Sequence, residues 1–194
     1  MKGYTDTFML TEKYKDFIEN TALKFQSNFK ETKEPNKYNY LEVQKWLESM
    51  GAEFRKGDGD YTIGNVIYLS FFDNERLNIN DNMENTKKLF HEVWHFISNR
   101  INGMQNQNDE ATPIQSKPDY YNDKPIQVVE ISANYFSRAM LLPEKNFVQS
   151  VMKNLNVNGS CDIFEVAKEF CVSYVDVIAR GNDLNIWNTK GGRQ

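Results

Sequence analysis

The chain has 194 residues, of which 40% are hydrophobic and 13% aromatic, so it fits one domain of ordinary size and is neither disordered nor fibrous. Its formal net charge of −4 and the lack of a long basic run argue against a surface for nucleic-acid phosphates. No stretch approaches the roughly 18 apolar residues of a membrane span, and the first residues lack the apolar segment of a signal peptide. Cys161 and Cys171 indicate buried free thiols and a cytoplasmic location rather than a disulfide framework.

Two helices are predicted in the first quarter of the chain. Apolar residues at helical spacing predict one helix near residues 11–30 and another from about Tyr40. Gly51 is well placed to end the second helix in a left-handed cap. The polar segment between them contains Pro35 and is typical of a linker.

The pattern of the next segment changes to that of short strands. Residues 53–55 begin one strand, and the letters KGDGD that follow are typical of a hairpin turn. Residues 66–69 and 77–79 predict two further strands. We therefore expect a small, mostly antiparallel sheet of three or four strands.

Helices return in the second half of the chain. One is expected from Asn85 to Gly103, followed by a polar loop over 104–125 that contains three prolines. The remaining helices are expected at about 126–143, 144–154, 162–170 and 173–180. Strands grouped together and followed by helices give an α+β fold rather than alternating βαβ units.

A histidine pair in the helix after the strands carries the chemistry. His91, Glu92 and His95 match the pattern H-E-x-x-H, in which both imidazoles lie on one helix face and can bind a single ion. Zinc lowers the pKa of a bound water to about 7, and the Glu92 carboxylate can take its proton and pass it to the leaving amine. These are the only two histidines in the chain. The pattern therefore predicts one catalytic zinc ion, with His91 and His95 as ligands and Glu92 as the general base.

A catalytic zinc usually has three protein ligands, and here the third must be a carboxylate because no further histidine exists. Ser98 and Ile101 exclude the extended three-histidine pattern of the metzincins. The downstream candidates are Asp109, Glu110, Asp119, Asp123, Glu130 and Glu144. We favour Glu130, because a carboxylate in an otherwise apolar helix needs a partner. A surface acid or a partner for Arg138 is the alternative interpretation of this glutamate.

Other residues of the same helix are candidates for supporting roles. Asn134 lies one turn after Glu130, so it could accept the remaining N–H of a metal-bound histidine. An outward-facing polar residue is the alternative. Candidates for stabilising the oxyanion are Tyr120, Tyr121, Tyr135 and Arg138.

These motifs together resemble the ImmA/IrrE family of zinc metallopeptidases. The resemblance rests on H-E-x-x-H at His91–His95, on E-x-x-A-N-x-F at Glu130–Phe136 and on the Leu-Leu-Pro that ends at Pro143. The C-terminal segment from Val166 to Ser173 is also similar, and the likeness covers roughly residues 40–187. Ser137 and Trp94 depart from the usual residues of the family, but neither replaces a ligand.

The resemblance implies a zincin-like fold with a thermolysin-like core and a protein substrate. Members of the family are encoded by phages, mobile elements or stress loci, and they cleave or otherwise inactivate a helix-turn-helix repressor. The resemblance thus implies an antirepressor peptidase. The expected organisation is an N-terminal helix and linker over 1–39, the zinc metallopeptidase domain over 40–187, and a polar tail over 188–194.

Three other functions stay open on the sequence. A non-proteolytic antirepressor or toxin-antitoxin component could act by protein binding on the same fold, and a zinc hydrolase could act on a small molecule. A DNA-binding regulator is suggested by the helix-turn-helix rhythm of residues 167–177. Residues 161–180 nevertheless have a net charge of −2, whereas a recognition helix should be basic, so we expect no direct nucleic-acid binding.

Overall fold

The computed structural model describes residues 10–30, 38–73, 75–77, 79, 82–108 and 124–187, without the side chains of 102–108 and 124–127. The described part is an α+β fold, mostly helical, with a small mixed sheet. This architecture agrees with the α+β, zincin-like fold expected from the sequence.

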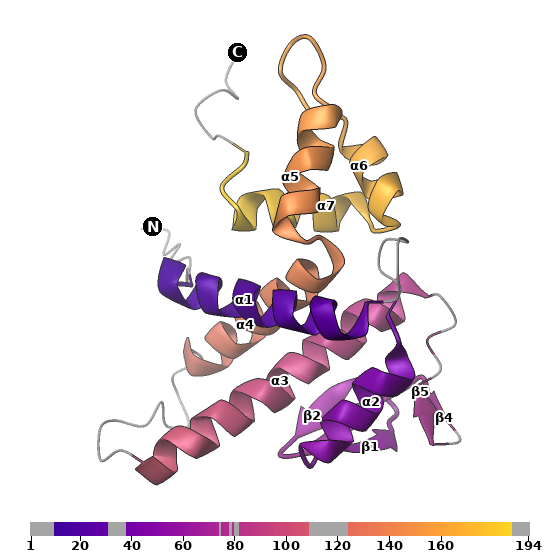
Figure 1. Cartoon of the computed structure of the whole chain (residues 1–194), viewed down its shortest axis with the longest axis vertical. Coiled ribbons are helices and arrows are strands. Elements are labelled where there is room, and N and C mark those ends of the chain that lie inside the picture. Colours follow the sequence, from indigo (N-terminus) through magenta and orange to yellow (C-terminus); the bar gives the residue numbers. More distant parts are fainter. Residues whose placement is uncertain are drawn as a thin grey trace, which may run out of the picture.

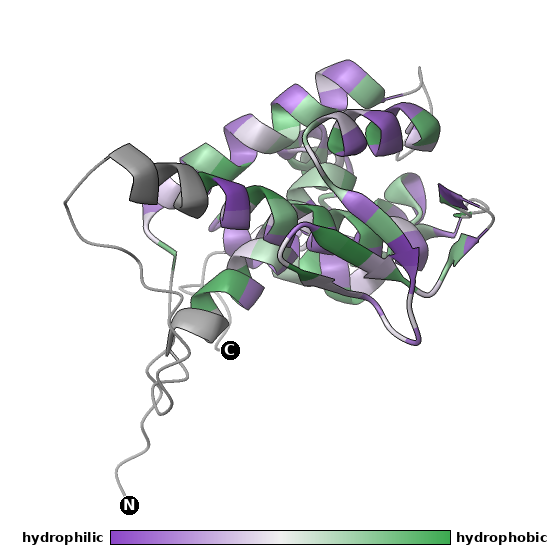
Figure 2. Ribbon diagram, turned by 90° about the horizontal axis from the view of Figure 1, so that it is seen from below, coloured by the Kyte–Doolittle hydropathy of each residue, from purple (hydrophilic) through white to green (hydrophobic). Residues whose placement is uncertain are grey.

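Two long helices form the centre of the molecule. α3 (Met83–Asn108) and α4 (Lys124–Leu141) pack against each other, and α1 (Glu12–Phe29) crosses them (Figure 1). Figure 2 shows hydrophobic residues concentrated in the elements at the middle of the molecule. One core joins α1, α2, the sheet, α3 and α4, and its fully buried side chains include Ile18, Leu47, Ile67, Phe90, Trp94 and Phe136.

The two N-terminal helices begin and end on local signals in the sequence. The Thr11 side chain caps α1 by accepting a hydrogen bond from the Tyr14 backbone N–H, and the Asn39 side chain caps α2 (Tyr40–Ser49) in the same way. Gly51, with φ at +89°, lies just after α2, so its predicted role in the left-handed cap is confirmed.

The three-stranded sheet is mixed, with one parallel and one antiparallel pairing. β3 (Val66–Leu69) is the central strand; it pairs in parallel with β1 (Glu53–Lys56) and antiparallel with β2 (Tyr61–Ile63). The predicted hairpin turn at KGDGD is therefore wrong, because this segment joins β1 and β2, which do not pair. The hairpin is instead made by β2 and β3 around Gly64, whose φ is +60°.

A second, two-stranded ribbon follows the sheet. β4 (Phe72–Asp73) pairs with β5 (Arg76–Leu77), and Glu75 between them has a left-handed φ of 62°. Ile79 was predicted to lie in the last strand, but it lies outside β5. Its side chain is only 2% exposed and is part of the core.

The last part of the chain folds into three short helices with their own core. They are α5 (Glu144–Lys153), α6 (Ile163–Phe170) and α7 (Tyr174–Asp183), close to the predicted ranges. They form the upper part of the molecule in Figure 1. Both cysteines are free, as predicted, but they are not buried: Cys171 is exposed and Cys161 is partly exposed.

A buried ion pair joins the two ends of the described chain. Arg180 of α7 is fully buried, and its guanidinium donates to the two carboxylate oxygens of Glu19 in α1 at 2.6 and 2.9 Å. Its Nε also donates to the Leu142 carbonyl oxygen at 2.9 Å. Helix α1 therefore shares a core with α4 and a charged contact with α7. The separation of residues 1–39 from 40–187 stays a prediction, and residues 188–194 lie outside the described residues.

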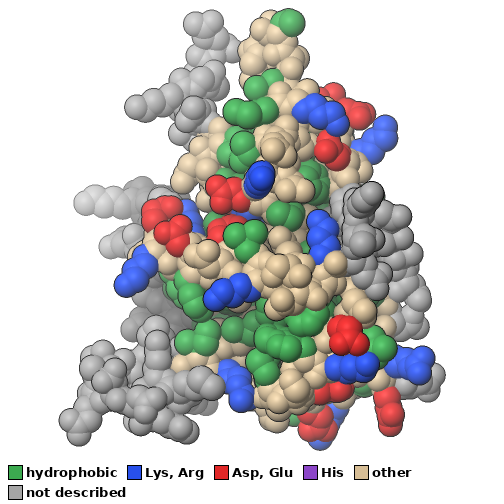
Figure 3. Space-filling model, in the orientation of Figure 1, with side chains coloured by type: hydrophobic (Ala, Val, Ile, Leu, Met, Phe, Trp, Pro, Cys, Tyr) green, Lys and Arg blue, Asp and Glu red, His purple; other side chains and the backbone are tan. Residues whose placement is uncertain are grey.

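The surface seen from the side of α1 mixes acidic, basic and hydrophobic side chains and has no broad basic area (Figure 3). Neither histidine is visible on this face. No helix within the described ranges is long and apolar enough to cross a membrane.

Candidate metal centre

The histidine pair lies on a helix whose opposite side is anchored in the core. Leu89, Phe90, Val93 and Trp94 of α3 are fully buried, and these residues fix the rotation of the helix. The side chains of His91 and His95, each next to one of these residues in sequence, are only 20% and 15% exposed. The core thus presents both imidazoles at its margin rather than in solvent.

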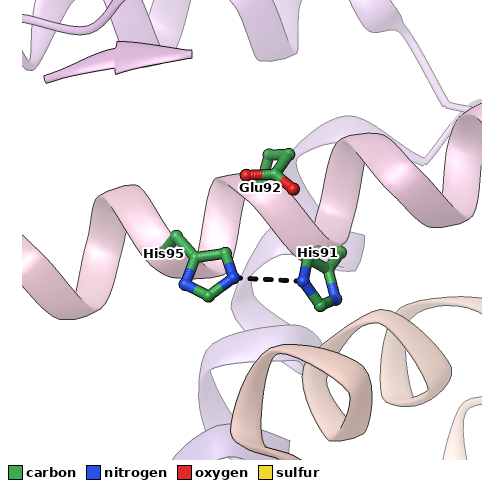
Figure 4. Close-up of side chains that lie close together, drawn as sticks. All are labelled: His91, Glu92 and His95. Carbon is green, nitrogen blue, oxygen red and sulfur yellow. Dashed lines mark hydrogen bonds between the residues drawn. The ribbon is translucent and has the colours of Figure 1, made fainter. Parts of the chain in front are cut away.

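Glu130 of α4 brings a carboxylate to the two imidazoles. The Nε2 atoms of His91 and His95 are 3.0 Å apart, as Figure 4 shows. One carboxylate oxygen of Glu130 is 3.3 Å from His91 Nε2, and the other is 3.3 Å from His95 Nε2. The three side chains that the sequence proposed as metal ligands therefore meet in one place, at the packing interface of α3 and α4.

The burial that we expected for Glu130 is not found. Its side chain is 50% exposed, so a carboxylate enclosed by an apolar helix is not the reason for its position. Its alternative role as a partner for Arg138 is not found either, because that guanidinium pairs with Asp183. What distinguishes Glu130 is its contact with both imidazoles.

The protonation of the imidazoles suits metal ligands. Burial lowers the pKa of His91 below its ordinary value, although Glu130 acts in the opposite direction. Burial also lowers the pKa of His95, and the neighbouring His91 lowers it further. Both rings are therefore neutral near pH 7, which is the form that binds a metal ion.

Glu92 lies beside the histidines but on another side of α3 (Figure 4). The nearest nitrogen and oxygen atoms of His91, Glu92 and His95 all lie within 4.8 Å of one another. Burial raises the pKa of Glu92 to about 7, with nearby Glu130 and Asp60 adding to the rise and a Thr62 hydrogen bond opposing it. A carboxylate whose pKa is close to neutral is matched to accepting and returning a proton.

Sequence reasoning missed the residue that holds this carboxylate. The Thr62 hydroxyl of β2 lies 2.8 Å from Glu92 Oε2 and 3.2 Å from the Glu92 backbone oxygen. The three-residue strand that contains Thr62 was not predicted. The local pattern would have pointed Thr62 outward, because its polar side chain lies between two apolar ones, yet it is Tyr61 and Ile63 that are exposed.

Of the supporting residues predicted on α4, Asn134 is the one that contacts a proposed ligand. Asn134 is exposed, and its side chain forms a hydrogen bond with His91. This contact is the one expected of a residue that orients a metal-bound histidine. The orienting role itself stays a prediction.

Both described oxyanion candidates face other partners. Tyr135 is buried, the Arg180 guanidinium lies 5.5 Å from its ring centre, and burial together with Glu19 raises the pKa of its hydroxyl. Arg138 donates two hydrogen bonds to Asp183, at 2.6 and 3.0 Å. The structure does not bring either residue to the imidazoles, so we assign neither to the oxyanion.

Several residues considered from the sequence lie outside the described part of the chain. They are Asp109, Glu110, Asp119, Tyr120, Tyr121 and Asp123. Glu144, the remaining carboxylate candidate, is an exposed residue in the first turn of α5.

The donor set fits a divalent transition metal. Two neutral imidazoles and one carboxylate, held by two helices, form the kind of three-ligand set found in catalytic zinc sites. The fold and the site together define a metallopeptidase-type domain, with an H-E-x-x-H helix packed between a small sheet and a second helix that supplies a glutamate.

Comparison with known protein families agrees with this class. The family model Peptidase_M78, described as the IrrE N-terminal-like domain, matches residues 54–180. The chain belongs to this family of metallopeptidases, as the resemblance of its motifs implied. A comparison with curated proteins finds no match.

Proposed function

We propose that the protein is a zinc-dependent endopeptidase with His91, His95 and Glu130 as the metal ligands and Glu92 as the general base. The observation that supports this most directly is the 3.3 Å approach of Glu130 to both Nε2 atoms. Glu130 lies far from the two histidines in the sequence, and the packing of α3 against α4 brings it to them. When bound, a zinc ion would lower the pKa of a coordinated water and polarise the substrate carbonyl.

The roles of the protein side chains follow from their positions. Glu92 Oε2 is engaged by Thr62, so Oε1 is the oxygen available to accept the proton of the attacking water. The same group then returns the proton to the amine that leaves. Asn134 holds the His91 ring in position through its hydrogen bond.

The edge of the sheet offers a place for an extended substrate. We expected a peptide to add to the sheet near residues 66–80, but β3 is the central strand and is paired on both sides. Among the described residues β2 is an edge strand, and its Thr62 contacts the proposed base. We therefore place the substrate backbone along the free edge of β2, where it would form main-chain hydrogen bonds.

We infer that the substrate is a regulatory protein, namely a helix-turn-helix repressor of a phage, a mobile element or a stress regulon. This inference is supported by membership of the family and by the motifs that resemble ImmA/IrrE. A cytoplasmic location is part of the same proposal, because such repressors act on cytoplasmic DNA.

Co-expression with the repressor encoded beside the gene tests the proposal. The wild-type protein should cleave the repressor, and Glu92→Gln should abolish cleavage while the protein keeps its metal. Glu84→Gln is the matched control, since Glu84 is an exposed residue of the same helix. Repressor inactivation that persists in Glu92→Gln without cleavage would instead establish the alternative, a non-proteolytic antirepressor that acts by binding.

A further inference from the structure

Thr62 is a polar residue in an otherwise apolar row across the sheet. In the strand register, Phe54 of β1 and Thr62 of β2 both lie opposite Ile67 of β3. Ile67 is fully buried and Phe54 is 8% exposed, so this row faces the interior, toward α3. A hydroxyl placed there needs a hydrogen-bond partner, and the partner is on α3.

That partner is the side chain of the proposed base. The Thr62 hydroxyl lies 2.8 Å from Glu92 Oε2, compared with 3.2 Å from the backbone oxygen of the same residue, so the carboxylate is the closer acceptor. The terminal torsion angle of a glutamate side chain takes a broad range of values when no contact restricts it. A hydrogen bond to one oxygen restricts this torsion and fixes the direction in which the other oxygen points.

The strand that carries Thr62 is itself fastened to the helix of the base. Asp60, two residues earlier, pairs with Lys88 of α3 at 3.1 Å. The Asp60 Oδ1 atom also accepts hydrogen bonds from the backbone N–H and the hydroxyl of Ser70, both at 2.8 Å. Thr62 is thus held between this contact and its pairing with β3, and it cannot move freely relative to Glu92.

We propose that Thr62 is a positioning residue that orients the Glu92 carboxylate for proton transfer. The proposal rests on the proposed function, since it assigns Glu92 as the base. It also implies that one strand serves two purposes, because β2 would seat the substrate by its free edge and align the base by an inward side chain. A positioning role should affect the chemical step more than substrate binding.

The test compares Thr62→Val, which keeps the shape of the side chain but removes the hydroxyl, with Thr62→Ser, which keeps the hydroxyl. The kinetic probe is an internally quenched peptide that is selected from a library for cleavage by the wild-type protein. We expect Thr62→Val to lower kcat about 10-fold with KM changed less than about 2-fold, and Thr62→Ser to restore most of the loss. Thr21→Val is the matched control, because the Thr21 hydroxyl bonds a backbone oxygen of α1 away from the site.

A second readout does not depend on cleavage. Acetohydroxamate can bind a metal and donate its hydroxyl proton to a neighbouring carboxylate, and its binding can be followed by the visible spectrum of the cobalt-substituted protein. Thr62→Val should raise the dissociation constant of acetohydroxamate about 10-fold, and Thr62→Ser should not. Thr62→Ala gives the same comparison if Thr62→Val does not fold.

The outcomes separate the two proposals. Normal kcat and normal acetohydroxamate binding in folded Thr62→Val would overturn the role of Thr62, whereas loss of cleavage in Glu92→Gln would still uphold the peptidase. Equal loss in Thr62→Val and Thr62→Ser, or loss of bound metal in both, would show a structural role and would also overturn it. Cleavage retained by Glu92→Gln would overturn the proposed function itself.

Discussion

The indole N–H of Trp94 donates a hydrogen bond to the hydroxyl of Ser132 at 2.9 Å, directly between α3 and α4. Trp94 is fully buried, and its ring stacks on Phe136 with 4.9 Å between centroids. The Ser132 hydroxyl in turn donates a hydrogen bond to the Val129 backbone oxygen at 2.8 Å. Trp94 adjoins His95, and Ser132 is two residues from Glu130, so this contact sets the spacing of the helices that carry the proposed ligands.

Ser132→Ala should therefore destabilise the protein. It leaves the buried indole N–H without an acceptor, at a cost of about 1–3 kcal/mol in the free energy of unfolding. Urea denaturation measures the change, and Ser27→Ala is the control, since Ser27 is exposed on α1. A double-mutant cycle with Trp94→Phe should show less than additive losses, and strictly additive losses would contradict the importance of this bond.

Metal content tests the ligand set directly. The purified protein should hold about one zinc per chain, and His91→Ala and Glu130→Ala should each reduce this content. Removing the metal with a chelator should lower Tm, since an ion present at about 1,000 times its Kd stabilises the fold by roughly 4 kcal/mol. Glu144→Ala is the control, because this glutamate is exposed on α5. Full zinc content in both His91→Ala and Glu130→Ala would show that the site is wrong.

Breaking the Glu19–Arg180 pair should lower the free energy of unfolding far more than breaking an ordinary surface pair does. Glu19→Ala leaves a guanidinium that is 0% exposed without its counter-charge, and removal of one member of a buried pair costs about 3–5 kcal/mol. Glu12→Ala, which removes the 76% exposed carboxylate that pairs with Lys15 on the same helix, should change stability by less than about 0.5 kcal/mol. Equal losses in the two variants, measured by urea denaturation, would contradict this account.

The Asp60 contacts predict a dependence of stability on pH. Burial alone would raise the pKa of Asp60, but hydrogen bonds from Ser70 and the charge of Lys88 outweigh it, so the pKa lies below its ordinary value of 3.8. A lowered pKa contributes stability above the unfolded value, and this contribution is lost as the pH falls through the folded value. Asp60→Asn should therefore destabilise the protein by about 1–2 kcal/mol at pH 7.

The difference in the free energy of unfolding between Asp60→Asn and the wild type should become smaller as the pH falls below about 4. Urea denaturation across pH 3 to 7 would measure it, with the exposed Asp58→Asn in the same loop as the control. A difference that stays constant over this range would rule out the ionised carboxylate as its source.

The helices could be predicted because each is long enough to show a period. The strands could not be predicted in full, since β2 has three residues and β4 has two, and no period is visible over so few positions. The parallel pairing of β1 with β3 depends on packing against α2 and α3, not on a local pattern. Missing β2 also meant missing Thr62, because its inward direction follows only from membership of that strand.

Within the site, helical geometry explains which predictions agree with the structure. Asn134 lies four residues after Glu130 and so on the same face, beside His91. Tyr135 lies five residues after Glu130, which is about 140° further round the helix, and it faces Arg180 instead. Arg138 lies about 12 Å from Glu130 along the axis of α4, which is about two turns away. The position of Glu130 agrees with our prediction although the burial argued for it does not hold.

The ion pair between Glu19 and Arg180 also bears on where this domain starts. The family model begins at residue 54 and ends at Arg180, so the last matched residue is neutralised by a carboxylate that the match leaves out. The region of sequence similarity is therefore shorter than the region needed to pair the charge of Arg180. A fragment trimmed to residues 54–180 would keep the proposed ligands but would leave Arg180 without its carboxylate partner. A fragment that keeps the ion pair must include α1.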